Sequence, residues 1–448
     1  MTRLLRSRFA GVMPVATVLI ATAWWTAARL RADPARVAVA DSTSAASAER
    51  RDGEIAFYER RVAEDPESAL DLAQLAGIYL QRGRELGQYS DIVRAETAAR
   101  RSLAIRTNHN GKTYLTLAAS LLAQHRFVEA RDAARSAVDY NPDVPAYGAM
   151  LGEIQLELGD YDAARATFRS LAGSRTSPSV AGRLARWAEI EGRTGDVRSI
   201  LNASLRDLES RTDVPREQVA WFYLRRGDVE LREGDLGAAE NAYRAGLHVW
   251  PADYRVLAAM ARLESLRGRP DRAIEYGERA IAISLDPATL GLVGDAYAAR
   301  GDSAQSEEYY RTMEIAVLRQ PGAFHRAWGL FLLDHDRRVS EVLANASAEI
   351  ATRRDVYGYD LLAWAFHKSG RDRDALQAST LALRMGTRDA MLLYHAAAIE
   401  HALGDDSAAR RDLRRALEIN PHFHPTQARA ARTLLDSLDR AVRRMPGS

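Results

Sequence analysis

Histidine is concentrated toward the end of this chain, where it could bind a partner or a metal. Seven of the ten histidines follow residue 320, and they share that stretch with tryptophan, tyrosine and aspartate. Aromatic side chains with histidine suit a pocket that anchors a peptide, and histidine with aspartate suits a transition metal. The candidate binding residues are His325, Tyr357, Asp360, Trp364, His367, Tyr394 and His401. No strict metal-ligand spacing is present among them, and packing of an uneven interior would use the same residue types.

Patterns typical of enzymes are missing from the sequence. Asn110-Gly111-Lys112-Thr113 ends like a phosphate-binding loop, but Arg106 stands where that loop requires glycine, and no strand is expected before it. The motifs H-E-x-x-H, G-x-S-x-G and G-x-G-x-x-G do not occur. The chain has no cysteine, which excludes disulfides, thiolate metal sites and cysteine nucleophiles. We therefore expect neither enzyme activity nor a cofactor.

The charge and the length of the chain limit the expected partners and the domain organisation. The 62 basic and 60 acidic residues give a net charge of +2, whereas a nucleic-acid-binding protein usually has a one-sided basic field. No nucleic-acid partner is therefore expected. A chain of 448 residues is also longer than one hydrophobic core usually serves, so it either divides into domains or repeats a small unit.

A turn signal recurs along the chain and indicates a repeat. Glycine followed by a polar residue returns mostly every 33 to 39 residues, at Gly159-Asp160, Gly195-Asp196, Gly234-Asp235, Gly268-Arg269, Gly301-Asp302, Gly370-Arg371 and Gly404-Asp405. Such a glycine can end a helix in a left-handed conformation. Proline closes several units, at Pro66, Pro142, Pro251 and Pro421, where no amide donor is needed.

Other positions keep a fixed distance from this glycine. Small residues, which let two antiparallel helices approach closely, stand seven positions before it at Gly152, Ala188, Gly227, Ala261, Gly294, Ala363 and Ala397. Small residues also stand five positions after it at Ala164, Ala239, Ala273, Ser306, Ala375 and Ala409, with Ile200 as the exception. Aromatic residues stand nine positions after it at Phe168, Tyr243 and Tyr310. Period and register together predict stacked helix pairs.

This spacing resembles the tetratricopeptide repeat (TPR), a helix-turn-helix family with a period of 34 residues. The clearest copy runs from Gly152 through Gly159-Asp160-Tyr161 to Phe168, and the resemblance covers roughly residues 54–421. It implies an all-α fold, a right-handed superhelical solenoid of about ten repeats. In this family ligands usually lie in the concave groove lined by the first helices, which is where the register places the candidate residues. One unit departs from the pattern, because His335-Asp336 replaces the turn glycine.

The N-terminus predicts a membrane anchor or an export signal. Arg3, Arg6 and Arg8 precede Phe9 to Ala28, about twenty uncharged residues, which is enough for a helix to cross a bilayer. A cleaved signal usually has a shorter apolar core followed closely by small residues, so an uncleaved anchor is favoured. We expect single-pass association with the inner membrane and repeats outside the cytoplasm, or an exported protein if cleavage occurs.

The expected organisation has four parts: a signal anchor or signal peptide over residues 1–32, a flexible linker over 33–52, the solenoid over 53–424, and a capping helix and tail over 425–448. Because solenoids offer long surfaces for partners, the predicted function is a protein–protein interaction scaffold or assembly factor of the cell envelope. It would bind a protein or peptide segment in the concave groove. The alternative is a solenoid that binds a small ligand or a metal through the C-terminal histidines.

Overall fold

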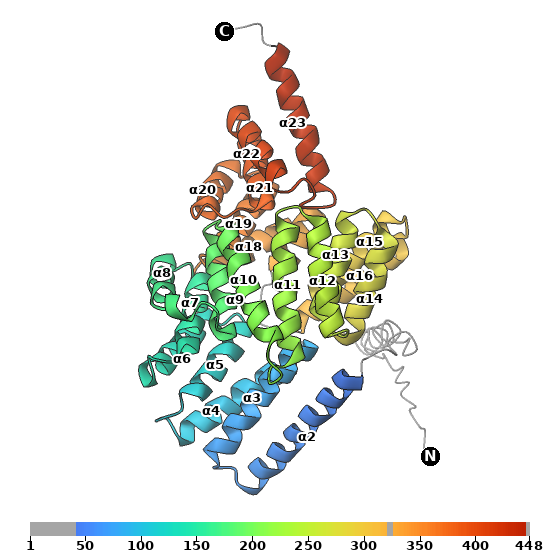
Figure 1. Ribbon diagram of the computed structural model, residues 1–448. Coiled ribbons are helices and arrows are strands. Elements are labelled where there is room, and N and C mark those ends of the chain that lie inside the picture. The colour runs from blue at the N-terminus through green and yellow to red at the C-terminus, as the bar shows by residue number, and fades with distance from the viewer. Residues whose placement is uncertain (1–41, 320–325, 445–448) are drawn as a thin grey trace, which may run out of the picture.

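The fold is a stack of antiparallel helix pairs, as the repeat spacing predicts (Figure 1). The computed structural model describes residues 42–319 and 326–444, and within these ranges it has 22 α-helices and no strand. One helix, α2, precedes ten pairs, and α23 follows them. The first five pairs are α3 (Ala69–Leu86) with α4 (Tyr89–Ile105), α5 (Gly111–Ala123) with α6 (Phe127–Tyr140), α7 (Pro145–Leu158) with α8 (Tyr161–Ser170), α9 (Pro178–Ile190) with α10 (Thr194–Glu209), and α11 (Arg216–Arg232) with α12 (Leu236–Val249).

The second five pairs lead to the C-terminal cap. They are α13 (Tyr254–Leu266) with α14 (Pro270–Ile283), α15 (Pro287–Ala299) with α16 (Ser303–Leu318), α17 (Arg326–Asp334) with α18 (Val339–Glu349), α19 (Val356–Lys368) with α20 (Asp372–Leu383), and α21 (Ala390–Ala402) with α22 (Asp406–Ile419). The capping helix α23 (Gln427–Arg444) packs on α22 through Ala428, Ala431 and Leu438. Figure 1 shows its C-terminal part extending beyond the stack.

The N-terminal helix differs from the predicted linker. Helix α2 (Ser42–Glu64) begins within residues 33–52, where the composition had predicted a flexible spacer. Alanine, glutamate and arginine favour helix in this segment, and Ile55 and Val62 bury against α3. The predicted anchor over residues 1–32 lies outside the described residues. None of the helices in residues 42–319 and 326–444 is long and apolar enough to span a membrane.

Glycine and aromatic residues pair within individual repeats. A Cβ on Gly227 would lie 2.3 Å from the ring of Tyr243, and a Cβ on Gly294 would lie 2.4 Å from the ring of Tyr310. Gly152 and Phe168 form the same pair, with a distance of 2.8 Å. In each case the aromatic residue on the second helix occupies the space that a side chain on the first helix would fill. The small residue before the turn and the aromatic residue after it therefore pack against each other as one unit.

Left-handed residues end most first helices, and two of them are not glycine. The turn glycines have φ between 69° and 84° from Gly192 to Gly404. The predicted turn at Gly195 was wrong, because Gly195 lies within α10 and Gly192 is the left-handed residue of this repeat. In the pair α5/α6 the turn residue is His125 (φ 59°), and in α17/α18 it is Asp336 (φ 53°). Histidine and aspartate are among the residues that tolerate this region best. The His335-Asp336 departure therefore keeps the turn geometry of the repeat.

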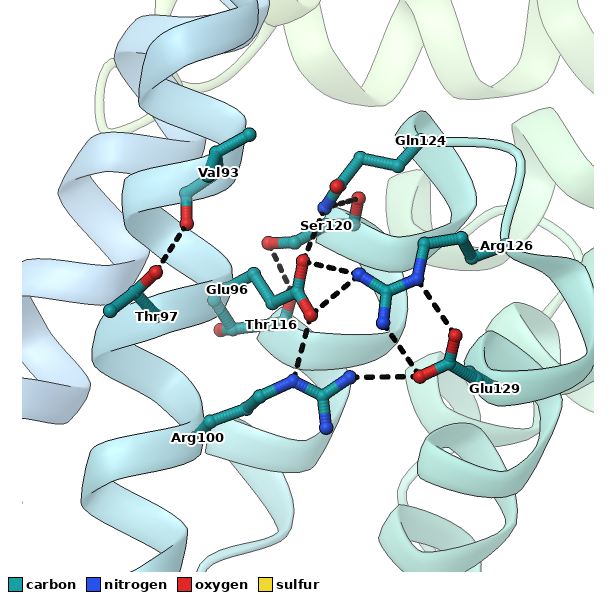
Figure 2. A network of polar contacts seen from close by, with 9 residues as sticks. All are labelled: Val93, Glu96, Thr97, Arg100, Thr116, Ser120, Gln124, Arg126 and Glu129. Carbon is teal, nitrogen blue, oxygen red and sulfur yellow. Dashed lines mark hydrogen bonds and ion pairs between the residues drawn. The ribbon is translucent and has the colours of Figure 1, made fainter. Parts of the chain in front are cut away.

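Neighbouring pairs are also joined by buried polar contacts. Figure 2 shows Glu96 of α4 accepting hydrogen bonds from Arg100 (2.7 Å), Gln124 (2.7 Å) and Arg126 (2.7 and 2.8 Å). Burial opposes ionisation of Glu96, but these three donors outweigh burial and hold its pKa below the usual value. Arg126 also pairs with Glu129. This network fixes α4 against the turn between α5 and α6.

The superhelix touches itself after one turn. Hydrogen bonds that cross the contact include those from Val356 N to Tyr161 Oη (2.8 Å), from Thr387 Oγ1 to the Ile190 carbonyl (2.7 Å), and from Asn420 Nδ2 to the Leu231 carbonyl (2.9 Å). Their partners lie 195, 197 and 189 residues apart. We call this contact the seam. It joins a first arc, α7–α13, to a second arc, α17–α23, which Figure 1 shows stacked beside each other.

The seam needs small residues at its turns. Gly192 (φ 69°) faces the second arc so closely that a Cβ would lie 2.4 Å from the Gly386 carbonyl oxygen. Gly268 has the same φ, but no atom lies within 4 Å of its Cβ position. Both alanine variants carry the strain of a left-handed residue, about 1–2 kcal/mol, and only Gly192→Ala also separates the arcs.

We therefore expect Gly192→Ala to lower the thermal midpoint more than Gly268→Ala, with an excess cost of about 1–3 kcal/mol. Small-angle X-ray scattering should show a larger radius of gyration for Gly192→Ala alone. Equal midpoints and equal radii for the two variants would show that the arcs do not meet at Gly192 in solution.

Candidate functional site

The structure separates the predicted binding residues that it describes into three groups. Asp360, Trp364, His367 and Tyr394 lie together where α19 meets α21. Tyr357 faces a cavity between the two arcs. His401 lies apart on the surface, where it pairs with Asp406 (2.7 Å). His325 lies outside the described residues.

The centre of the first group is a buried ionic contact. Nδ1 of His395 donates to Asp360 (2.8 Å), and Arg326 donates to the other carboxylate oxygen of Asp360 (2.6 Å). His395 is 1% exposed and Asp360 is 2% exposed. Burial opposes ionisation of Asp360, but His395 and Arg326 outweigh it and hold the pKa of this carboxyl below its usual value. The contact joins α17, α19 and α21.

Trp364 stacks on this contact and is itself buried. Its ring lies 4.2 Å from the His395 ring, centroid to centroid, with 13° between the planes. Its Nε1 donates to Asp334 (3.1 Å), which also accepts from Gln427 of the capping helix (2.8 Å). Trp364 is only 5% exposed, so its ring does not line an open groove. Trp364 is buried because the second arc packs its aromatic residues inward, between successive first helices.

The edge of the first group, around the buried Trp364, is exposed to solvent. The His367 side chain is 22% exposed, stacks on Trp364 with a centroid distance of 5.0 Å, and pairs with Asp372 (2.6 Å). Lys368 is equally exposed, and its Nζ lies 5.8 Å from the Trp364 ring centroid. We call His367, Lys368 and the half-buried Tyr394 the rim. The rim is the part of the predicted site that a partner can touch without unfolding the arc.

The histidines do not form a metal centre in the described part of the chain. No group of three or more histidine, aspartate or glutamate side chains there is arranged to hold a metal ion. Asp360 and Nδ1 of His395 are already committed to each other and to Arg326. The metal-binding form of the alternative hypothesis therefore has no geometric support in these residues.

A cavity that the sequence did not predict lies between the arcs. Its volume is about 350 Å³, and six arginines line it: Arg186, Arg225, Arg232, Arg262, Arg326 and Arg353. The lining also includes Tyr357 and three acidic residues, Glu189, Asp228 and Asp389. We call this the central cavity. Its walls come from first helices of both arcs, so it exists because the seam is closed.

One carboxylate of the central cavity, Glu189, is held in its ionised form. Glu189 accepts from Arg225 (2.8 Å) and from Arg232 (2.8 Å). Burial would raise its pKa, but Arg232 and Arg225 outweigh burial and hold the pKa of Glu189 at about 2. Arg186 likewise pairs with Glu157 (2.5 Å) behind the wall. These contacts fix the orientation of the arginines.

The repeat register offered a signal for this cavity. Arg225 stands nine positions before the turn glycine Gly234, where other repeats have Met150, Leu292 and Leu361. A charged residue at a position that is otherwise apolar indicates a local polar site. His395 occupies the same register position in its own repeat, and it is the centre of the buried contact with Asp360.

Another perturbed carboxyl lies on α21. Burial, reinforced by Asp412, raises the pKa of Glu400 to about 7. A carboxyl with a raised pKa holds more protons in the folded chain than in the unfolded chain between about pH 4.5 and pH 7. Stability is therefore lost as the pH rises through this window.

We expect Glu400→Gln to stabilise the protein at pH 8 by about 1 kcal/mol and to have little effect at pH 5, because the amide cannot ionise. Urea unfolding at the two pH values measures this difference. Glu418→Gln, at an exposed position on α22, is the control and should change nothing. A Glu400→Gln effect that is the same at both pH values would contradict a raised pKa.

Comparison with known proteins supports the repeat assignment. A family model of the tetratricopeptide repeat matches residues 115–180 and 224–289. No curated protein matches the sequence. Similar solved structures include the APC/C hetero-tetramer Cut9–Hcn1, which is 13% identical with a TM-score of 0.34 and covers 88% of this chain and 94% of that chain.

Two further solved structures are similar to part of this chain. A tetratricopeptide repeat protein from Parabacteroides merdae is 15% identical with a TM-score of 0.33, covering 64% of this chain and 98% of that chain. The human IFIT1 dimer with PPP-AAAA is 14% identical with a TM-score of 0.42, covering 69% of this chain and 73% of that chain.

The family model matches two of the segments in which glycine, small residues and aromatic residues keep a common register, α5–α8 and α11–α14. Helix pairs continue through the rest of the described structure, ten in all. Proteins built from this repeat bind other proteins in general. Residues 115–180 and 224–289 are thus similar to the tetratricopeptide-repeat family, and the described helices form an all-α helical repeat solenoid.

Proposed function

We propose that this protein is a non-catalytic scaffold of the cell envelope that holds a segment of a partner protein on its second arc. The observation that carries the proposal is the rim, where His367, Lys368 and Tyr394 surround the edge of the buried Trp364. Aromatic side chains in well-packed surroundings provide most of the binding free energy at many interfaces. The apolar N-terminal stretch, Phe9 to Ala28, supports the placement in the envelope.

The repeat offers a matched pair of histidines to test the rim. His367 and His401 are 34 residues apart, and each contacts an aspartate five residues later through Nδ1. Only His367 also stacks on tryptophan. The double variant His367→Ala with Lys368→Ala should lose capture of partners from membranes by the full chain, whereas His401→Ala should retain it.

The test requires that both variants unfold at the same temperature as the parent. Unchanged capture by the double variant, or equal loss in His401→Ala, would rule out the rim as the docking surface. The envelope placement is tested separately, because the full-length chain should stay with membranes after a high-salt wash. Recovery of that chain in the soluble fraction would reject the anchor.

A further inference from the structure

The central cavity combines excess cationic lining with contributions from two distant parts of the chain. Arg186, Arg225, Arg232 and Arg262 come from the first arc, while Arg326 and Arg353 come from the second. We propose that this cavity binds a compact polyanion, a small molecule carrying two or more phosphate or carboxylate groups, and that the bound molecule bridges the two arcs. The site is separate from the rim and does not depend on the proposed scaffold function.

The charges of the lining favour an anion. Six arginines and three acidic residues line the cavity, and Arg225 and Arg232 share one carboxylate, Glu189. Arg225 also pairs with Asp228, and Arg353 pairs with Asp355 and Glu349, which lie outside the lining. Within the described residues no carboxylate forms an ion pair with Arg262. A guanidinium carries five N–H donors in a planar fork that fits phosphate and carboxylate oxygens. Donors therefore remain after the internal ion pairs are formed.

Unsatisfied donors are found on both arcs. The Nε groups of Arg186 and Arg326 are buried and have no hydrogen-bond acceptor among the described residues. Buried N–H groups are nearly always paired in folded proteins. Glu157 and Asp360 hold these two arginines in place from behind the cavity wall. Both guanidinium groups are thus fixed in the cavity wall, and the protein does not satisfy all of their donors.

The size of the cavity limits the ligand. A volume of about 350 Å³ lies within the range of pockets for small molecules, about 300–1,000 Å³. A folded partner or a nucleic-acid duplex does not fit, and the closed seam restricts entry of a long chain. A molecule with at least two anionic groups is favoured because the arginines face it from both arcs.

If the ligand bridges the two arcs, its affinity should depend on whether the seam is closed. A ligand that contacts both arcs binds the closed superhelix and not the open one, so it stabilises closure by mass action. Variants that weaken the seam should then bind more weakly even though every arginine is intact. Gly192→Ala is such a variant, and Gly268→Ala is its control.

The experiment is a titration of the full-length chain with pyrophosphate and with citrate, followed by thermal midpoint and by calorimetry at constant ionic strength. At least one of the two should raise the midpoint saturably, and the comparison distinguishes phosphate from carboxylate recognition. Arg262→Gln should weaken binding of that probe about tenfold, the effect of losing one charge-assisted contact. Arg206→Gln removes the same charge from an exposed position on α10 and should leave binding unchanged.

Several outcomes would overturn the proposal. One is the absence of a saturable shift with either probe, and another is an equal effect of Arg262→Gln and Arg206→Gln. A third is loss of binding in Arg411→Gln with Arg415→Gln instead, because these residues line a separate arginine-rich hollow on α22. Undiminished affinity in Gly192→Ala would reject bridging of the two arcs.

Discussion

Gly227→Ala should destabilise the protein by about 2–3 kcal/mol, although alanine is the better helix former. Two atoms of the Tyr243 ring lie 2.3 and 2.5 Å from the position of the new Cβ. Real Cβ atoms do not approach so closely, so the ring or the helix must move. The ring is fully buried, and its hydroxyl donates to Asp228 (2.9 Å). Overpacking of this kind in a filled core costs about 1–3 kcal/mol and occasionally more.

A second glycine-to-alanine substitution serves as the control, and its expected effect on the free energy of unfolding is opposite. Gly77 lies in the middle of α3, and no atom lies within 4 Å of its Cβ position. Gly77→Ala should therefore stabilise the protein by about 0.5–1 kcal/mol, the usual gain for alanine in a helix. Urea unfolding of both variants measures the difference. Stabilisation by both substitutions would show that Gly227 and Tyr243 do not pack as described.

The sequence also indicates which second substitution would relieve the overpacking caused by Gly227→Ala. One repeat that has alanine in place of Gly227 has serine in place of the aromatic residue, namely Ala363 with Ser379. The double variant Gly227→Ala with Tyr243→Ser should thus lose less stability than the sum of the two single variants. A coupling free energy of about 1 kcal/mol or more is expected for residues in such close contact.

The helix pairs were predictable because they depend on local pattern. Glycine turns, small residues and proline breaks recur at a fixed period, and each has its effect within about forty residues. The first helices α13, α15, α19 and α21 end at turn glycines that this pattern marks, Gly268, Gly301, Gly370 and Gly404. Helix α2 was partly missed, because its residues 42–52 have helix-forming composition but no apolar stripe.

The seam and the central cavity were not predictable from the same pattern. They depend on how far each helix pair rotates against the next, and the small rotations accumulate over the many residues that separate the partners of each seam hydrogen bond. Thr387 and Asn420 look like ordinary loop residues until the superhelix brings them to Ile190 and Leu231. Burial of Trp364 has the same origin, because the register could place it on a first helix but could not tell how closely the helices pack.

Asp360→Ala should be the most damaging change in the second arc, costing about 3–5 kcal/mol. The carboxylate is completely buried and is the shared partner of His395 and Arg326. Removing one member of a buried ionic contact leaves the others desolvated without compensation. Arg326 would then be left without its buried counter-charge beside the central cavity, and Nδ1 of His395 would lose its acceptor.

A comparison with Asp406→Ala separates this effect from the loss of any histidine–aspartate pair. Asp406 contacts Nδ1 of His401 at nearly the same distance, 2.7 Å against 2.8 Å, but both of those side chains are exposed. An exposed pair contributes about 0–1 kcal/mol, so Asp406→Ala should change the free energy of unfolding little. Asp360→Asn should lie between the two variants, because the amide keeps an acceptor oxygen for one donor and loses the charge. If Asp360→Ala costs no more than Asp406→Ala in urea unfolding, then Asp360 does not hold α17, α19 and α21 together, and the rim loses the rigid base on which a partner would dock.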